Sequence, residues 1–237
     1  MTPRRRGAVV AAFALLLAAA GAAACRATRR EPPWNALFDG RSLAGWRESA
    51  FGGNGPIELV DGRLLLGQGS PLTGVTWIGS AAGGADAVPR DGAAAGDLPF
   101  PRDGYELELE AARLLGNDFF CALTFPVGGA HLTLVLGGWG GSLCGLSCLD
   151  GLDAAENETR SHRRFERGRS HRVRLRVAEG RVAAWLDGEP LVDVDTRGRV
   201  LSLRPEVEPS RPLGIATFAT QGAIADVRWR LVPPERG

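Results

Sequence analysis

Hydrophobic and polar residues alternate along most of the chain after Trp34. The segment Tyr105–Glu110 places Tyr105, Leu107 and Leu109 on one side and three glutamates on the other, as a half-buried strand does. A surface helix would repeat its apolar positions every three or four residues, and no sustained pattern of that kind occurs. The alternation therefore predicts an all-β domain in which these glutamates form a solvated face.

Turn signals divide this pattern into short antiparallel strands. Asp61-Gly62 separates two apolar runs and predicts a hairpin, whereas Glu179-Gly180 and Asp187-Gly188 predict a three-stranded meander. The runs "DFFCALTFPV" and "HLTLVLGG" are more continuously apolar, which is typical of central strands covered on both faces. We therefore expect an antiparallel two-sheet β-sandwich over residues 34–234.

The first 24 residues have the pattern of an export signal. Arg4, Arg5 and Arg6 precede an uncharged apolar run, and the small residues Ala22–Ala24 precede Cys25, as in the cleavage box of bacterial lipoproteins. We expect a lipoprotein-type signal peptide over residues 1–24, lipidation of Cys25 and a polar linker over residues 25–33. Ordinary secretory cleavage is the alternative, and an uncleaved anchor is the third. The protein would be exported to the cell envelope, as a periplasmic protein or as an outer-membrane lipoprotein whose lipid contacts the membrane.

The composition and the absence of known motifs exclude several classes of function. The formal net charge is only +1 and every basic residue is arginine, so no concentrated positive field indicates a nucleic-acid partner. The chain has no Gly-x-Ser-x-Gly elbow, phosphate-binding glycine loop or His-Glu-x-x-His metal motif. We therefore expect no cofactor, although a divalent metal is kept as an alternative for the acidic stretch described below.

Three cysteines remain in the expected mature domain, so one disulfide at most could form within it. Cys144 and Cys148 would lie about 13 Å apart on an extended strand, which is too far for a bridge. Buried free thiols are the favoured interpretation, and Cys121–Cys144 or Cys121–Cys148 is the alternative.

Several motifs occur in the order found in a known family. The segment "LFDGRSLAGW" (Leu37–Trp46) resembles the opening of the 3-keto-disaccharide hydrolase family, and "VDGRLLLGQG", "VAAWLDGEPLVD" and "PLGIATFATQGAIADVRWRLV" resemble its later hairpins and closing strands. Where that family has a Gly-Gly-Asn-Ser-Gly segment, this chain retains Asn117 but has Asp118 and Phe119 next. The resemblance implies a concanavalin A-like, laminin-G-like jelly roll.

The same resemblance implies a secreted glycoside-processing hydrolase that acts on 3-keto-glycosides or a related modified saccharide. A 3-keto group acidifies the neighbouring C2 hydrogen, so a base could expel the substituent at C1 before water adds. A non-catalytic carbohydrate-binding envelope module of the same fold is the alternative, and a structural envelope protein without a ligand is the third. In the first two cases the partner is a saccharide.

The stretch "LDGLDAAENETR" (149–160) concentrates acidic residues after a central strand. Its spacing of three between Asp150, Asp153 and Glu156 does not match an EF-hand calcium loop, and a solvated connection is the plainest interpretation. The functional alternative is a carboxylate group at the rim of a sugar-binding face. The Asn157-Glu158-Thr159 triplet also matches a glycosylation sequon, which a bacterial leader makes incidental.

Other polar and aromatic residues complete the expected site. His131, with an ordinary pKa near 6.5, joins Asp150, Asp153 and Glu156 as a candidate catalytic acid or base. Trp139 lies among glycines and could stack on a sugar ring, although a tryptophan is more often part of a core. The candidate substrate-binding residues are Asn117, Asp118, Trp139, Asn157 and Arg160.

Overall fold

The computed structural model describes residues 31–79 and 100–233. Its contacts divide the chain into two units, Met1–Pro32 and Pro33–Gly237, and the second unit holds all of the strands described below. The expected signal peptide and Cys25 lie outside the described residues. Within the described ranges, no helix has both the length and the apolar character needed to cross a membrane.

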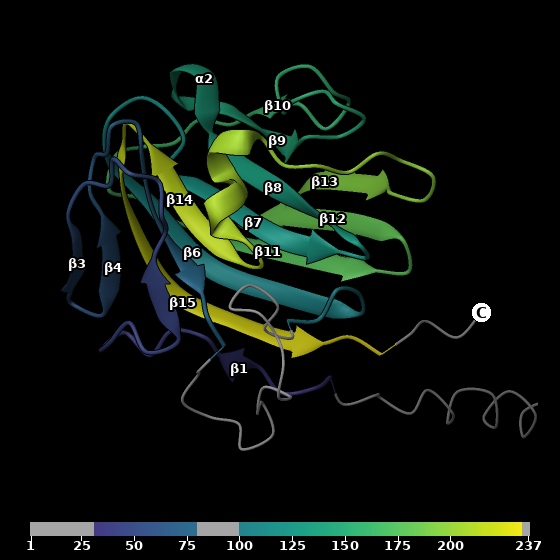
Figure 1. The fold of residues 1–237 in the computed structure, drawn as a ribbon, viewed down its shortest axis with the longest axis horizontal. Coiled ribbons are helices and arrows are strands. Elements are labelled where there is room, and N and C mark those ends of the chain that lie inside the picture. The colour runs from purple at the N-terminus through teal and green to yellow at the C-terminus, as the bar shows by residue number, and fades with distance from the viewer. Residues whose placement is uncertain (1–30, 80–99, 234–237) are drawn as a thin grey trace, which may run out of the picture. The chain divides into compact units, whose positions relative to one another are not determined.

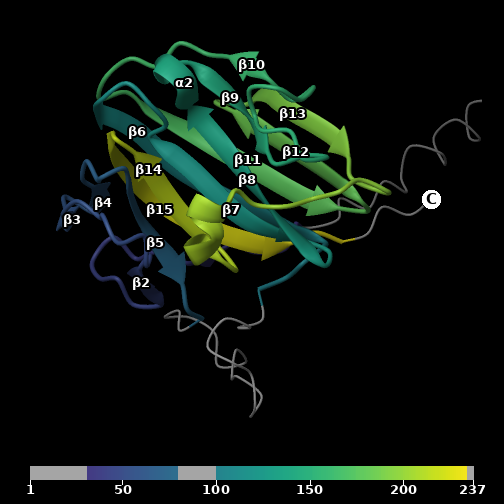
Figure 2. The same cartoon turned by 45° about the horizontal axis from the view of Figure 1, so that its top comes forward.

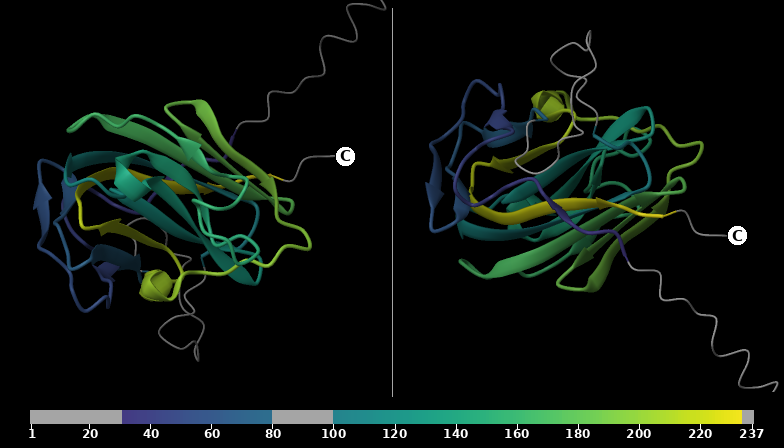
Figure 3. Two further views of the ribbon diagram at one scale, coloured as in Figure 1. Left: turned by 90° about the horizontal axis from the view of Figure 1, so that it is seen from above. Right: turned by 90° about the horizontal axis from the view of Figure 1, so that it is seen from below.

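Two antiparallel sheets stack face to face in the second unit (Figures 1 and 3). The eight-stranded sheet has the order β13-β12-β11-β6-β15-β4-β3, with β1 paired to β15. Its strands are β1 (Asn35–Ala36), β3 (Ile57–Val60), β4 (Arg63–Leu66), β6 (Tyr105–Leu115), β11 (Ser170–Ala178), β12 (Arg181–Leu186), β13 (Glu189–Asp195) and β15 (Gln221–Leu231).

The seven-stranded sheet has the order β10-β9-β8-β7-β14-β5-β2. Its strands are β2 (Trp46–Glu48), β5 (Leu72–Trp77), β7 (Cys121–Val127), β8 (Ala130–Gly137), β9 (Leu143–Ser147), β10 (Ser161–His162) and β14 (Gly214–Phe218). A short turn, α2 (Gly138–Gly141), joins β8 to β9, and a 3-10 helix, η1 (Pro205–Ser210), precedes β14. The expected jelly-roll sandwich is confirmed, as are the β3–β4 hairpin and the β11–β12–β13 meander.

The inner faces of the two sheets form one hydrophobic core. Leu123, Leu134 and Leu146 lie in register on β7, β8 and β9, and each is almost completely buried. Full burial of a leucine stabilises a fold by about 1.5–3 kcal/mol, so such rows hold the sheet in a single register. Tyr105 connects the layers, because its hydroxyl donates to the Pro126 carbonyl oxygen at 2.6 Å.

The glutamates of β6 differ from expectation. They alternate with the core residues as expected, but Glu106 is only 1% exposed and Glu108 9% exposed, so these two are not solvated, whereas Glu110 is partly exposed. Arg174 and Arg230 donate to Glu106, and Trp34 stacks on Arg230 with 4.4 Å from guanidinium carbon to ring centroid. Long arginine side chains from the neighbouring strands therefore cover the carboxylates, which the alternation alone does not reveal.

The cysteines form no disulfide in the described residues; Cys121, Cys144 and Cys148 are all free. The register explains this, because Cys121 and Cys144 each pair with Leu136 from opposite sides. Two strand spacings of about 4.8 Å separate their backbones, beyond the reach of a disulfide. Cys148 lies beyond the far end of β9, so neither alternative bridge forms and the buried thiol interpretation holds for Cys121 and Cys144.

Candidate functional site

A cleft crosses the outer face of the seven-stranded sheet. Thr133 and Val135 point to this face because Leu132, Leu134 and Leu136, their neighbours on β8, belong to the core. The cleft encloses about 200 Å³. Its floor comes from five adjacent strands and consists of Leu72, Phe218, Ala122, Thr133, Val135 and Ser147. Its walls are Asp118, Phe119, Trp139, Arg204, Glu206 and Val207.

One wall is the 3-10 helix η1, which lies across the sheet in front of β7 and β14 (Figure 2). Pro205 begins this helix, and Pro209 lies within it. The Thr76 hydroxyl of β5 donates to the Pro209 carbonyl oxygen at 2.7 Å, and Val207 is buried. These contacts fix η1 to the sheet, so this wall is part of the folded core and the cleft is formed in advance of any ligand.

The opposite wall carries an exposed tryptophan on a strained turn. Trp139 has φ 46°, a left-handed conformation that is unfavourable for a bulky side chain, and the residue is 45% exposed. Gly140 and Gly141, which follow Trp139, also have positive φ, as does Gly137 just before α2, so three of the four α2 residues have left-handed backbone. Strain of this kind persists where the surrounding structure enforces it and is concentrated at functional sites.

Asp118 helps to hold the strained backbone of the α2 turn in place. Its Oδ1 accepts from the backbone N–H of Phe119 at 2.8 Å and of Trp139 at 3.3 Å. The Asp118 backbone N–H donates to the Thr220 hydroxyl at 3.0 Å. One carboxylate oxygen therefore holds the tryptophan turn, whereas Oδ2 has no partner among the described residues and lines the cleft with the rest of the side chain.

Charged side chains lie at the η1 side of the cleft. Arg204 donates to Glu206 Oε1 at 3.0 Å and to Asp153 Oδ2 at 3.2 Å. A hydrogen bond from its own backbone N–H, with a smaller contribution from Arg204, holds the pKa of Glu206 below its ordinary value. Glu206 therefore stays ionised at neutral pH, and Asp153 reaches the cleft only through Arg204.

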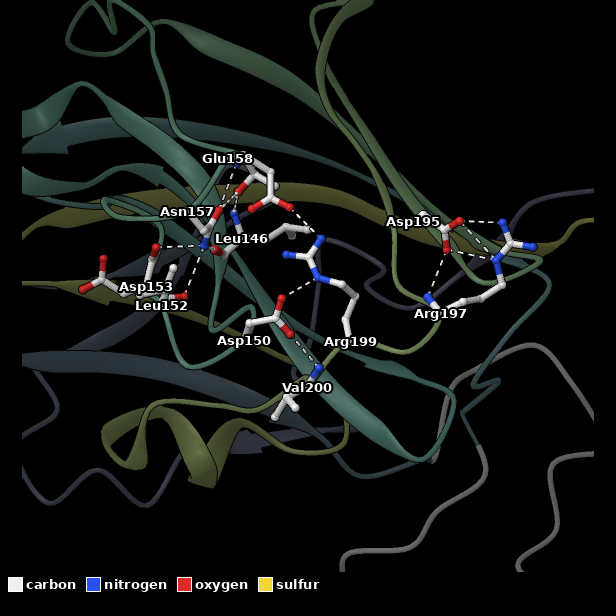
Figure 4. Close-up of polar contacts among 11 residues, drawn as sticks. Leu146, Asp150, Leu152, Asp153, Asn157, Glu158, Asp195, Arg197, Arg199 and Val200 are labelled. Carbon is white, nitrogen blue, oxygen red and sulfur yellow. Dashed lines mark hydrogen bonds and ion pairs between the residues drawn. The ribbon is translucent and has the colours of Figure 1, made fainter.

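Two other carboxylates of the acidic stretch, Asp150 and Glu158, pair with Arg199 and do not line the cleft (Figure 4). Asp150 accepts from the Val200 backbone N–H at 2.8 Å and pairs with Arg199 at 2.5 Å, and Glu158 pairs with the same arginine at 2.6 Å. These bonds lower the pKa of Asp150, chiefly through Val200, and that of Glu158, chiefly through Arg199. Both groups are therefore ionised at neutral pH, and their bonds tie the acidic stretch to the connection before η1.

Asn157 is the anchor of this stretch. Its side-chain N–H groups donate to the carbonyl oxygens of Leu146 at 2.7 Å and Asp153 at 2.8 Å, and its Oδ1 accepts from the Thr159 hydroxyl at 2.6 Å. The side chain is buried and its polar atoms are satisfied within the protein. Of the other two expected residues in this stretch, Glu156 is exposed, and Arg160 is exposed and donates to the Ala155 carbonyl oxygen.

His131 lies on the same outer face as Thr133 but does not line the cleft. Only 9% of it is exposed, and its Nε2 has no hydrogen-bond partner among residues 31–79 and 100–233. Burial, assisted by the positive charges of Arg211 and Arg102, lowers its pKa to about 4. The imidazole is therefore neutral at physiological pH, and it is not among the residues that line the cleft.

The structure thus brings together only part of the expected site. Asp118 and Trp139 line the cleft and Asp153 contacts its edge, whereas His131, Asp150, Glu156, Asn157 and Arg160 do not line it. Asn117 is exposed and lies beside Gly141 on the other side of the α2 turn. Sequence reasoning missed Arg204, Glu206 and Phe218. The proline-rich connection "LRPEVEPS" was the available signal for the first two, because long connections frequently carry function.

No group of three or more histidine, cysteine or acidic side chains suited to a metal ion occurs in residues 31–79 and 100–233. The charged residues that line the cleft are Asp118, Arg204 and Glu206.

Comparisons with known proteins identify the fold. No family model and no curated protein sequence matches the chain. Among solved structures, a Crh5 transglycosylase in complex with NAG is similar with a TM-score of 0.54 at 8% identity, covering 85% of each chain. A galectin-like protein of unknown function from Bacillus subtilis is similar with a TM-score of 0.52 at 11% identity, covering 86% of this chain and 97% of that one.

A non-specific endo-β-1,3(4)-glucanase, SCLam, is also similar, with a TM-score of 0.48 at 11% identity over 84% of this chain and 93% of that one. Several further neighbours are glycosyl hydrolases or carbohydrate-binding modules by description. The likeness to the Crh5 transglycosylase and to the galectin-like protein, at 8% and 11% identity, shows a shared fold.

Proposed function

We propose that this protein binds a saccharide in the cleft on the outer face of the seven-stranded sheet. The observation that carries the proposal is Trp139, which a strained turn holds exposed at the rim. An aromatic face stacks well on the apolar face of a sugar ring, and the hydroxyls of Thr133 and Ser147 on the floor offer hydrogen bonds. The carbohydrate-related neighbours on the same fold support this choice by analogy.

The size of the cleft limits what it holds. At about 200 Å³ it is smaller than the roughly 300–1,000 Å³ of pockets for drug-sized ligands. The space suits one sugar ring, and further units of an oligosaccharide would extend over the surface beyond Trp139.

A Trp139→Gly substitution tests the proposal. Glycine adopts positive φ without the penalty of about 1–2 kcal/mol, which offsets the lost packing of a half-exposed ring, so the fold should keep its stability. We expect saccharide binding, found by glycan-array screening and quantified by calorimetry, to fall at least tenfold. Trp185→Ala, on the outer face of the other sheet, is the matched control and should bind normally. Equal loss in both variants, or undiminished binding by Trp139→Gly, would refute the proposal.

A second candidate function is the processing of 3-keto-glycosides, as the sequence resemblance implies. The observation favouring it is the free Oδ2 of Asp118 beside Trp139. A carboxylate there could take the C2 proton, and the released electron pair would form a C1–C2 double bond as the C1–O bond breaks and the leaving alcohol acquires a proton. Water would then add across the double bond to complete net hydrolysis.

Turnover of 3-keto-glucosides beside the unoxidised glucosides, with and without divalent metal, tests this candidate. The Asp118→Asn variant should lose turnover but retain binding, because the amide oxygen still accepts from the N–H groups of Phe119 and Trp139. Absence of turnover of either substrate by the wild type would leave a non-catalytic carbohydrate-binding protein.

We also propose export to the cell envelope through a lipidated Cys25. The support is the leader pattern and the small residues before Cys25. Metabolic labelling with a fatty acid should mark the wild-type protein and not Cys25→Ser, and detection of an unlabelled wild type would exclude the lipid anchor.

A further inference from the structure

A second hollow, of about 430 Å³, lies on the other side of the α2 turn. Arg113 of β6 and the segment that contains β10 form most of its wall. Its lining is Arg113, Gly141, Ser142, His162, Arg163, Arg164 and Phe165. Trp139 lines the cleft and Gly141 lines this hollow, so a single short turn separates the two sites. We call the second hollow the basic pocket.

Positive charge in the basic pocket is uncompensated. No carboxylate lines it, and Arg113, Arg163 and Arg164 form no ion pair with any described residue. In contrast, at least ten other arginines of the described chain are ion-paired. Residues 161–170 contain one acid, Glu166, among four arginines. The net charge of the whole chain is only +1, so this concentration of positive charge is local and would attract an anionic ligand to the basic pocket.

Backbone oxygens hold two of these guanidinium groups in place. Arg113 donates to the carbonyl oxygens of Gly141 at 3.1 Å and Phe165 at 2.6 Å. Arg163 donates to those of His162 at 3.0 Å and Pro190 at 3.3 Å. Each guanidinium carries five N–H donors, so three on each remain for a ligand. Arginine forks held in this way match the paired oxygens of a carboxylate or a sulfate.

Gly141 is required for this arrangement. A Cβ at position 141 would lie 2.3 Å from Nη1 of Arg113 and 2.7 Å from Oδ1 of Asn117. At Gly140, with φ +91° against +92° at Gly141, a Cβ would meet nothing within 4 Å. The close contact of Arg113 with the α2 turn therefore depends on the missing side chain at position 141.

We propose that the basic pocket binds the carboxylate or sulfate group of an acidic saccharide whose neighbouring ring occupies the cleft. The inference rests on the proposed saccharide function and names its ligand class. Trp139 stacks on the sugar ring from one side of the turn, and Arg113, Arg163 and Arg164 neutralise the anionic substituent on the other. Ser142 and His162, which hydrogen-bond to each other at 3.1 Å, line the same pocket and add polar contacts.

Two matched pairs of probes test the charge preference. The first pair is an oligogalacturonate and its methyl ester, and the second is dextran sulfate and dextran. We expect the anionic member of at least one pair to bind at least tenfold more tightly than its neutral partner in calorimetry at low salt, and we expect this preference to shrink as salt rises. Free inorganic sulfate should compete only weakly, because it lacks the sugar ring.

Two variants test whether the basic pocket causes the preference for anionic saccharides. The double variant Arg163→Gln/Arg164→Gln should lose the tenfold preference, and Gly141→Ala should weaken it by displacing Arg113. Their controls are Arg47→Gln, an exposed arginine on β2 at the opposite edge of the same sheet, and Gly140→Ala, which carries the same backbone strain without the clash. Both controls should retain the preference.

The outcomes separate the two proposals. Saccharide binding that depends on Trp139 but shows no preference for the charged probes, or a preference that survives the double arginine variant, would overturn the basic-pocket inference alone. Failure of every saccharide to bind would overturn the proposed function and this inference with it. Equally tight binding of sulfate and sulfated saccharide would show an anion site without a sugar and would also refute the inference.

Discussion

His131 makes the stability of the domain depend on pH in a way that one substitution isolates. Burial and the charges of Arg211 and Arg102 lower its pKa to about 4, whereas the unfolded chain should have the ordinary value of about 6.5. Between these values the unfolded state binds a proton at this position and the folded state does not. Stability from this group is therefore complete above pH 6.5 and declines as the pH falls towards 4.

The size of this loss in stability follows from the difference between the folded and unfolded pKa values of His131. Each pH unit in this window costs about 1.4 kcal/mol, so lowering the pH from 7 to 5 should remove about 2 kcal/mol from the free energy of unfolding through His131 alone. Continuing to pH 4 should bring the loss to about 3 kcal/mol. Other groups titrate in the same range, so the difference between wild type and a His131→Gln variant is the informative quantity.

Urea unfolding of both proteins at pH 7 and pH 5 measures that difference. The wild type should lose about 2 kcal/mol more than His131→Gln over this interval, at unchanged denaturant slope. Equal losses in the two proteins would refute the reasoning, because the native imidazole would then titrate as it does in the unfolded chain.

Three further predictions follow from buried groups. Asn157→Ala should destabilise the domain by about 2–3 kcal/mol in urea unfolding, because it removes the side chain that donates to the carbonyl oxygens of Leu146 and Asp153. The control Glu156→Ala changes an exposed neighbour and should cost at most about 0.5 kcal/mol. Similar costs for the two variants would contradict the structural role of Asn157. Glu106→Ala should cost about 3–5 kcal/mol, because it removes the buried carboxylate to which both Arg174 and Arg230 donate. Asp193→Ala, in an exposed pair with Arg181, should cost about 0–1 kcal/mol, and an equally small cost for Glu106→Ala would contradict the reasoning. Iodoacetamide at pH 8 should alkylate Cys148 in the native protein but not Cys121 or Cys144. Burial raises the pKa of Cys121 to about 12 and that of Cys144 to about 11, so neither thiol forms the reactive thiolate at this pH. A disulfide found by mass spectrometry would contradict the strand register that separates these cysteines.

The sequence predicted the fold well because strands and tight turns are coded locally. The alternation in Tyr105–Glu110 and the turn at Asp61-Gly62 depend on adjacent residues only, and both correspond to elements of the structure. The burial of Glu106 was not predictable in the same way. It depends on Arg174 and Arg230, which are far away in sequence and become neighbours only through strand order.

The functional site was harder to predict from the sequence than the fold, for the same reason. The floor of the cleft takes one or two residues from each of five strands, and Arg204 and Glu206 of its wall lie more than 50 residues after Asp150 in the sequence. A local cluster of acids is conspicuous in sequence, but here Asp150 and Asn157 make their bonds within the protein. Trp139 was identified from the glycines around it and Asp118 from the segment that resembles the known family, and a hydrogen bond from the Trp139 backbone N–H to Asp118 brings them together.

The central claim is that a saccharide occupies the outer-face cleft beside Trp139, and nuclear magnetic resonance mapping tests it most directly. Titration with a saccharide that binds should shift the indole N–H of Trp139 and the backbone amides of Thr133, Ser147 and Phe218, while the outer face of the eight-stranded sheet around Trp185 stays unchanged. Shifts confined to the eight-stranded sheet, with Trp139 unmoved at saturation, would contradict the account.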